Sequence, residues 1–260
     1  MSNSKMFFVN AYMEGFYLKQ LQNPNVPIEE RRGIEHLDLN DELILVQAPI
    51  EQVGQALSQM RQVNSWERNV YQRSIELVDQ SSLLIFQFRR HPWTIIQSSG
   101  FFPHRILLKD EYAQSLSGLL CAKAIYYLIS DTGGYIGYHF FNCGELLEKF
   151  YKEPPEVFGI EEYEYEYEYK YEYEYEDEYE DEDENEFIGM CEFRSQLSQK
   201  EVHEIGDGYR FTDDFLLEQN AYVPAFKWVD DLKAGQKFTI SWEGIERNDF
   251  ERMDYITLTC

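Results

Sequence analysis

The most unusual short segment of the sequence is a run of basic and aromatic residues, Arg89-Arg90-His91-Pro92-Trp93. Guanidinium groups form charge-assisted hydrogen bonds with anions, and a neighbouring indole offers a flat apolar surface. Arg89, Arg90, His91 and Trp93 are therefore candidate binding residues for an anion or a peptide. The plainer interpretation, which we favour, is a solvated hairpin turn whose Trp93 side chain enters the core.

Catalytic chemistry has little support in the residue spacing. His139 and Cys143 are the nearest base and nucleophile in sequence, but on a continued strand they would stand about 13 Å apart, too far for thiol activation. The sequence contains no GxGxxG, Walker A, GxSxG or HExxH motif. We therefore assign no catalytic residues. The enzyme alternative is a hydrolase or transferase whose site combines distant residues, namely His91, His104 or His139 with Asp131 or Cys143.

The four cysteines, Cys121, Cys143, Cys191 and Cys260, lie 22, 48 and 69 residues apart and form no CxxC pair. Such spacing is typical of free thiols in a reducing cytoplasm. Cys121 lies in an apolar helical pattern, which predicts a small core residue. The five histidines form no paired-ligand spacing with the thiols, so we expect no metal site and no cofactor.

A strongly acidic tract separates two segments of ordinary composition. Between Glu161 and Phe187 the chain has 16 Asp or Glu residues and one Lys, which account for −15 of the formal net charge of −25. From Tyr163 to Glu176 tyrosine and glutamate alternate, except for Lys170, so an extended chain would carry the two types on opposite faces. Repulsion between the glutamates predicts a solvated, disordered low-complexity insert at residues 156–189. The alternative is a weak polyanionic surface for basic partners.

The elements that would position the candidate residues are clearest between residues 41 and 155. Ile50, Val53, Leu57 and Met60 recur at helical spacing and predict an amphipathic helix, and a second helix is expected from Asp110. Expected strands are residues 43–46, 70–78, 83–88, 93–97, 125–130 and 135–141. Hairpin turns are expected at residues 89–92 and 131–134, and Asn142-Cys143-Gly144 predicts a further turn before a short helix or strand edge at 145–151.

Residues 190–260 resume an ordinary composition. Thr212-Asp213-Asp214 predicts the cap of a short helix through residues 215–219, with Asn220 as its stop. Alternation of apolar and polar residues at 238–242 predicts a half-buried strand, and residues 254–259 are expected to form a closing strand.

The order of these elements indicates an α+β fold, in which helices pack on one face of an antiparallel-rich sheet and a C-terminal α/β segment packs on it. The predicted organisation is an N-terminal lead-in at residues 1–40, an α+β core at 41–155, the acidic insert at 156–189 and the C-terminal segment at 190–260.

Residues 44–66 resemble the opening of helix-grip lipid-binding domains, through the strand end at Ala48-Pro49, the helix carrying Val53 and Leu57, and Trp66. The resemblance ends there. Those domains continue through several long strands to a long C-terminal helix, whereas the second apolar helix of this chain falls near residue 116. No residue role is carried over from that family.

Membranes and nucleic acids are disfavoured as partners. No stretch of 18 consecutive apolar residues occurs, and Asn10 and Glu14 interrupt the apolar N-terminal segment, so we expect neither a membrane span nor a signal peptide. Phosphate binding needs an extended basic surface, which this acidic chain does not supply. The expected location is the cytoplasm.

These observations favour a non-enzymatic cytoplasmic protein that binds another macromolecule through an acidic surface, as an accessory protein or an immunity-type inhibitor would. The expected partner is a basic protein, because an acidic surface accelerates its encounter. Two alternatives remain open: the enzyme described above, and a small-molecule sensor with an apolar pocket between sheet and helices. Three titratable side chains in one cleft would favour the enzyme, and an empty apolar cavity would favour the sensor.

Overall fold

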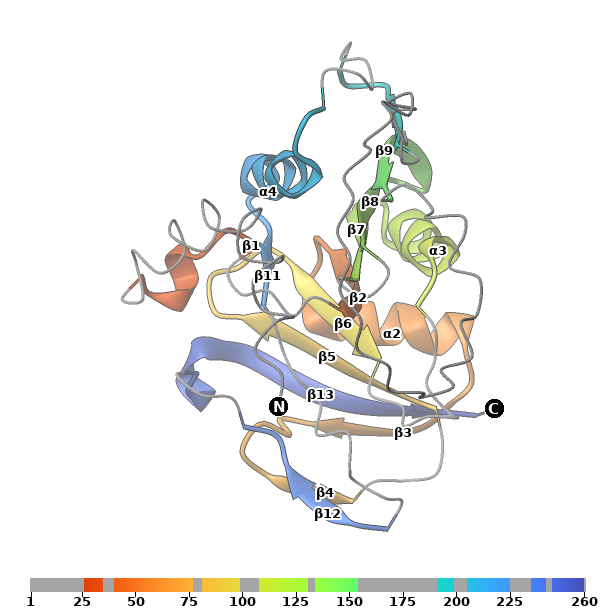
Figure 1. The fold of residues 1–260 in the computed structure, drawn as a ribbon. Coiled ribbons are helices and arrows are strands. Elements are labelled where there is room, and N and C mark those ends of the chain that lie inside the picture. Colours follow the sequence, from red (N-terminus) through yellow and green to blue (C-terminus); the bar gives the residue numbers. More distant parts are fainter. Residues whose placement is uncertain are drawn as a thin grey trace, which may run out of the picture.

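One large antiparallel sheet organises the computed structural model, which describes residues 26–34, 40–76, 81–98, 108–130, 134–153, 191–198, 205–224, 235–241 and 245–259 (Figure 1). Its strands within these ranges are β2 (Asn40–Val46), β3 (Val63–Arg68), β5 (Ser82–Phe88), β6 (Thr94–Ser98), β7 (Lys123–Ser130), β8 (Tyr135–Asn142), β9 (Glu145–Lys152), β10 (Cys191–Ser195) and β13 (Phe250–Leu258). Their spatial order is β10-β9-β8-β7-β2-β6-β5-β13-β3, and all neighbouring pairs run antiparallel. A mixed α+β fold with an antiparallel-rich sheet is therefore confirmed.

An early strand and the last strand of the chain both lie inside this sheet. The early strand β2 is hydrogen-bonded between β6 and β7, and the last strand, β13, is hydrogen-bonded between β5 and β3 (Figure 1). Residues 190–260 also supply the edge strand β10. The C-terminal segment thus shares one sheet with the predicted core, and β3 would lose its described sheet neighbour without it.

Helices cover both faces of the sheet rather than one. The helices α2 (Ile50–Met60) and α3 (Asp110–Leu120) contact each other on one face, and α4 (Gly208–Glu218) lies on the other (Figure 1). Adjacent residues of β8 show this, because the Tyr138 ring stacks on Phe215 of α4 while the His139 imidazole bonds Asp110 of α3. Successive side chains of a strand point to opposite faces. The expectation that the helices share one face is corrected accordingly.

Smaller elements complete the cover on the α4 side. The 3-10 turn η1 (Ile28–Glu30) leads into β1 (Gly33–Ile34), which pairs in parallel with β11 (Tyr222–Val223). The Asp213 carboxylate of α4 accepts a hydrogen bond from the Ile34 amide at 2.9 Å. A separate antiparallel pair is formed by β4 (Ser74–Glu76) and β12 (Lys237–Thr239). The short helix η3 (Arg247–Asp249) leads into β13. Segments far apart in the sequence therefore close one core.

Most of the expected strands and helices are confirmed, but of the strand expected at residues 70–78 the structure shows only β4 (Ser74–Glu76). The chain forms β3 earlier and β4 later, and between them Asn69 and Gln72 adopt a positive φ of 57°. The Asp254 carboxylate accepts a hydrogen bond from the Asn69 amide and holds this turn. Val70 and Tyr71 are buried in the turn, so their apolar character signals core packing rather than strand.

The helix expected from Thr212 begins four residues earlier. Asp207 is its N-cap, and its carboxylate accepts hydrogen bonds from the amides of Tyr209 and Arg210. Asn220 follows the helix with a φ of 54°, as expected for a stop. Residues 145–151 form the strand β9. The acidic insert, the turn at 131–133 and Trp242 lie outside the described residues.

Cys121 and Cys143 form a disulfide, which corrects the expectation of free thiols. Cys121 ends α3 and Cys143 lies in the β8–β9 turn, both exposed and both with a left-handed backbone. Cys121 is therefore not a core residue. Cys191 is free, and Cys260 lies outside the described residues. Because lasting disulfides are typical of oxidising compartments, the thiol argument for the cytoplasm no longer holds, and the cytoplasmic location stays a prediction.

Among the described residues, no helix is both long enough and apolar enough to cross a membrane.

We predict opposite effects for alanine at two helical glycines. A Cβ on Gly54 of α2 would overlap the Trp66 ring, whose indole donates to the Asp254 carboxylate at 2.9 Å. Gly54→Ala should lower the free energy of unfolding by about 1–3 kcal/mol, because the ring must shift. The control is Gly118→Ala in α3, where the nearest atom to the Cβ is 3.6 Å away. It should raise stability by about 0.5–1 kcal/mol through helix propensity.

Urea unfolding of both variants checks this prediction. Gly54→Ala at or above wild-type stability would contradict the contact between α2 and Trp66.

The disulfide generates a second prediction. It closes a loop with a sequence separation of 22 residues, so its loss should lower the free energy of unfolding by roughly 2–4 kcal/mol. We expect the phosphine reductant TCEP to lower the melting temperature of the wild type, and the Cys121→Ala/Cys143→Ala variant to melt at that lower temperature with or without TCEP. A wild type whose melting is insensitive to TCEP and matches the double variant would contradict the pairing.

Candidate functional site

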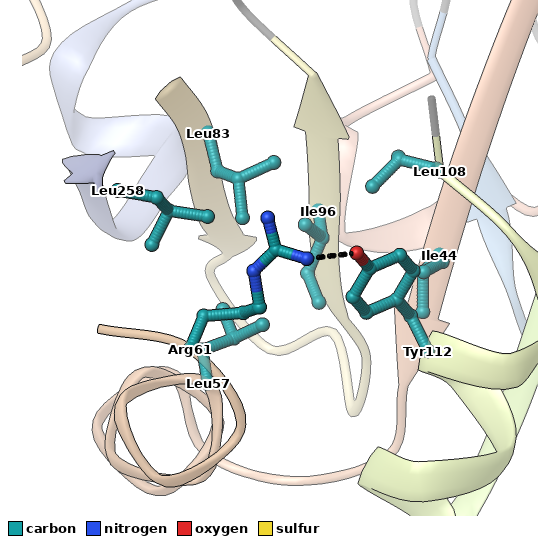
Figure 2. A pocket seen from close by; sticks show the side chains of 8 residues that line it. All are labelled: Ile44, Leu57, Arg61, Leu83, Ile96, Leu108, Tyr112 and Leu258. Carbon is teal, nitrogen blue, oxygen red and sulfur yellow. Dashed lines mark hydrogen bonds between the residues drawn. The ribbon is translucent and has the colours of Figure 1, made fainter. Parts of the chain in front are cut away.

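Aliphatic side chains from helices and sheet line a hollow between α2, α3 and the sheet, here called the α2–α3 pocket (Figure 2). The aliphatic lining is Ile44, Leu57, Leu83, Ile96, Leu108 and Leu258. The space inside it that a water molecule can enter is about 10 Å3. That is room for about one water molecule, so a larger ligand would have to push the lining side chains apart.

Strand register explains why this floor is apolar. Ile44 of β2 lies directly opposite Ile96 of β6, and both point to the face that α2 and α3 cover. Leu83 and Leu258 extend the same face from β5 and β13. Since the opposite face is also buried, β2 and β5 carry runs of four consecutive buried apolar residues, at 43–46 and 83–86, rather than alternate ones.

Two polar side chains stand at the pocket among these aliphatic ones. Arg61 follows the last turn of α2, and Tyr112 lies in the first turn of α3. The Arg61 Nη1 group donates a hydrogen bond of 2.6 Å to the Tyr112 hydroxyl, and the guanidinium carbon lies 5.8 Å from the centre of that ring. Figure 2 shows the Arg61 side chain reaching across the gap between the helices. Both residues are half-buried.

The lining determines what the pocket can do chemically. It holds no carboxylate and no imidazole, so it offers a low-dielectric surface with one cation and one phenol at its edge. The surface that lines the hollow itself is apolar, and such a surface suits an apolar group.

A second arrangement of titratable groups lies on the β8 side of α3. The His139 Nδ1 atom is 2.9 Å from the Asp110 Oδ2 atom, and the His139 side chain is 13% exposed. Burial lowers the pKa of His139, although the Asp110 carboxylate opposes this shift. A neutral imidazole that donates from Nδ1 presents its Nε2 lone pair, which is the form a general base needs.

The enzyme alternative is not assembled around this imidazole within the described residues. The Cys143 sulfur is bonded to Cys121, and Asp131 and His104 lie outside the described part of the chain. In the register, Tyr126 lies between Ile44 of the pocket and His139, which places His139 roughly 10 Å from Ile44 across the sheet. The His139–Asp110 pair and the α2–α3 pocket are therefore separate features.

His91 and Trp93, two of the sequence candidates for binding, are buried in the structure. Trp93 is 1% exposed, and its indole donates a hydrogen bond to the Gln219 carbonyl at 3.1 Å. The His91 Nε2 atom lies 2.7 Å from the Ile28 carbonyl oxygen, and Arg32 lies beside the ring. The contacts of His91 with Ile28 and Arg32 attach the N-terminal segment to the β5–β6 hairpin.

Arg89 and Arg90, by contrast, are exposed at the hairpin turn. Arg90 forms a 3.5 Å ion pair with Glu29 while its side chain stays 75% exposed. Such a surface pair contributes little. A binding site at this turn would therefore present the two arginines without His91 and Trp93, and anion binding here stays a prediction.

Sequence reasoning did not identify Arg61 or Tyr112 as functional candidates. They lie 51 residues apart, on two different helices, and neither forms a recognisable motif. Comparison with known proteins supplies no template, since no family model, curated protein or solved structure matches the chain. The one available signal is the position of Arg61 directly after an amphipathic helix.

The buried His91 predicts an acid sensitivity. Burial, helped by the positive charge of Arg32, lowers its pKa to about 4. Below pH 6.5 the unfolded chain therefore binds a proton that the folded protein does not, so stability falls as the pH falls towards 4. Between pH 7.5 and 5 this imidazole should cost about 2 kcal/mol.

We expect His91→Gln, which keeps a donor for the Ile28 carbonyl, to lose less stability than the wild type over that interval. Urea unfolding of both proteins at each pH measures the difference, and groups common to both, including His139, cancel. Equal losses for the two proteins would contradict the low pKa of His91.

Proposed function

We propose that this protein binds a small apolar molecule in the α2–α3 pocket, as a sensor or carrier would. The observation that carries the proposal is the pocket itself, an aliphatic hollow whose lining comes from both helices and four strands of the sheet. The space that a water molecule can enter is about 10 Å3, so a larger ligand enters only when the lining side chains move apart, which costs part of the binding free energy.

The size of the pocket sets the scale of the affinity. Burying one methylene group contributes about 0.8 kcal/mol. Burying a six-carbon chain would gain about 4–5 kcal/mol, from which the cost of opening the pocket is subtracted, so the dissociation constant should be on the order of 1 mM or above. A larger natural ligand would reach higher affinity through groups outside the hollow.

The other interpretations rest on different features. Binding of a basic macromolecule rests on charge that is concentrated at residues 161–187, outside the described residues, and it stays a prediction. The enzyme alternative combined His91, His104 or His139 with Asp131 or Cys143; the structure instead pairs His139 with Asp110, on the far side of Tyr126 from the pocket. The apolar pocket is the feature that distinguishes the sensor from both.

The proposal is tested with 1-hexanol as a neutral apolar probe. Calorimetric titration should detect binding to the wild-type protein, and Leu57→Phe should abolish it because the ring occupies the hollow. The matched control is Leu119→Phe, the same change at a 51% exposed residue of α3, which should bind hexanol like the wild type.

Hexanol binding of equal strength to wild type and Leu57→Phe would place the probe elsewhere and contradict the proposal. Thermal melting of each variant checks that the fold is retained.

A further inference from the structure

The strand β10 (Cys191–Ser195) forms one edge of the large sheet. β9 lies on one side of it, and the described ranges place no strand on the other side. A strand at the edge of a sheet presents a row of backbone N–H and C=O groups that can pair with another chain. What this edge can pair with depends on which of its backbone groups point outward and on the side chains that accompany them.

The ladder between β10 and β9 identifies the outward backbone groups. The Gln196 amide, directly after β10, donates to the Leu147 carbonyl of β9 at 2.8 Å. Backbone groups alternate in direction along an antiparallel strand, so residues 192 and 194 also point their backbones to β9. The N–H and C=O groups of Cys191, Phe193 and Ser195 therefore point away from the sheet.

Two opposite charges lie on one face of this edge. Glu192 and Arg194 are two residues apart, and the Glu192 carboxylate contacts Arg194 at 3.1 Å and Lys149 of β9 at 2.8 Å. The Arg194 side chain remains 78% exposed, so it keeps donors for a further carboxylate. Phe193 points to the other face, where its ring centre lies 5.3 Å from that of Phe211 in α4.

A twofold axis at Phe193 would match these features in two copies of the chain. Two β10 strands paired antiparallel about that axis place residue 192 of each copy opposite residue 194 of the other. Glu192 then meets the partner's Arg194 at both non-hydrogen-bonded pairs, where side chains approach most closely. Phe193 lies opposite the partner's Phe193, and Cys191 opposite the partner's Ser195, which are the positions with outward backbone groups. Hydrogen bonding and charge therefore select the same register.

The other edge of the sheet, β3, has no such match. Residues directly opposite each other in a twofold antiparallel pair share a face, whereas Glu67 and Arg68 are consecutive and point to opposite faces. No twofold register can therefore set Glu67 opposite the partner's Arg68. Charged residues on an edge strand usually prevent association. In β10 their spacing makes the edge complementary to itself.

We infer that β10 is a self-association edge, through which two copies of this chain join their sheets into one continuous sheet. The inference goes beyond the proposed function and does not depend on the α2–α3 pocket. The contact is short, so the dimer belongs to the weak, transient class of protein interfaces. The net charge of −25 on each copy acts against it. Screening at about 0.15 M salt confines that repulsion to roughly 8 Å, whereas Glu192 and Arg194 interact at hydrogen-bond distance.

Sedimentation velocity of the full-length protein tests the inference at about 0.15 M salt and at protein concentrations from about 5 to 500 µM. The sedimentation coefficient of the wild type should rise with concentration from the monomer value towards the dimer value. Glu192→Arg sets two arginines opposite each other at both contacts, and Arg194→Glu sets two glutamates there. Each reversal should weaken dimerisation by at least about tenfold, because like charges meet.

A mixture of the two variants tests the pairing itself. In a heterodimer of Glu192→Arg with Arg194→Glu, both contacts again join opposite charges. An equimolar mixture should therefore dimerise within about threefold of the wild type, although each variant alone is monomeric at the same concentration. The matched control is Arg247→Glu, the same charge reversal at an exposed residue of η3, which leads into β13 at the far side of the sheet. It should dimerise like the wild type.

The outcomes decide the inference. A wild type that stays monomeric over this range overturns it, and so does a dimer that neither charge reversal weakens more than Arg247→Glu does. A mixture that stays monomeric overturns the pairing of Glu192 with the partner's Arg194. Melting curves confirm that each variant is folded. If Glu192→Arg is unstable beside Lys149, the comparison of Arg194→Glu with Arg247→Glu still tests the edge, because the Arg194 side chain is exposed.

Discussion

The structure depends on covering both faces of its central strands. β2, β5, β6 and β13 carry apolar side chains on both sides, so each face must be removed from water. On one face α2 and α3 provide the cover, and on the other α4 does so together with the segment around β1 and β11. A sheet with this composition could not remain stable with a single layer of helices.

The α2–α3 pocket follows from this arrangement. Two neighbouring helices each pack on a twisted sheet through one side. The space that remains between the helices and the sheet is filled only by side chains long enough to reach it. Here the filling residues are leucines and isoleucines, with Arg61 bridging to Tyr112 above them. Arg61 and Tyr112 thereby close the packing gap between the two helices.

The buried carboxylate of Asp254 has partners from distant segments of the chain. Asp254 is fully buried on β13, and burial raises its pKa, but Trp66, Asn69 and Arg252 all contact its carboxylate. Arg252 also contacts Glu51 of α2 and, with Arg68, lowers the pKa of that carboxyl group. This network connects the first turn of α2 to the last strand and helps to hold α2 on the sheet beside the pocket.

Sequence patterns were sufficient to predict the local elements. Helical spacing predicted α2 and α3. Continuous apolar runs and turn residues predicted β2, the β5–β6 hairpin and the β7–β8 pair. The sequence also indicated that Trp93 would enter the core. It did not reveal that β13 lies between β5 and β3, that α4 covers the opposite face, that Cys121 meets Cys143, or that Arg61 meets Tyr112. Periodicity reports which side chains need burial, whereas the choice of partner depends on the free energy of contacts between distant segments, which only the folded chain decides.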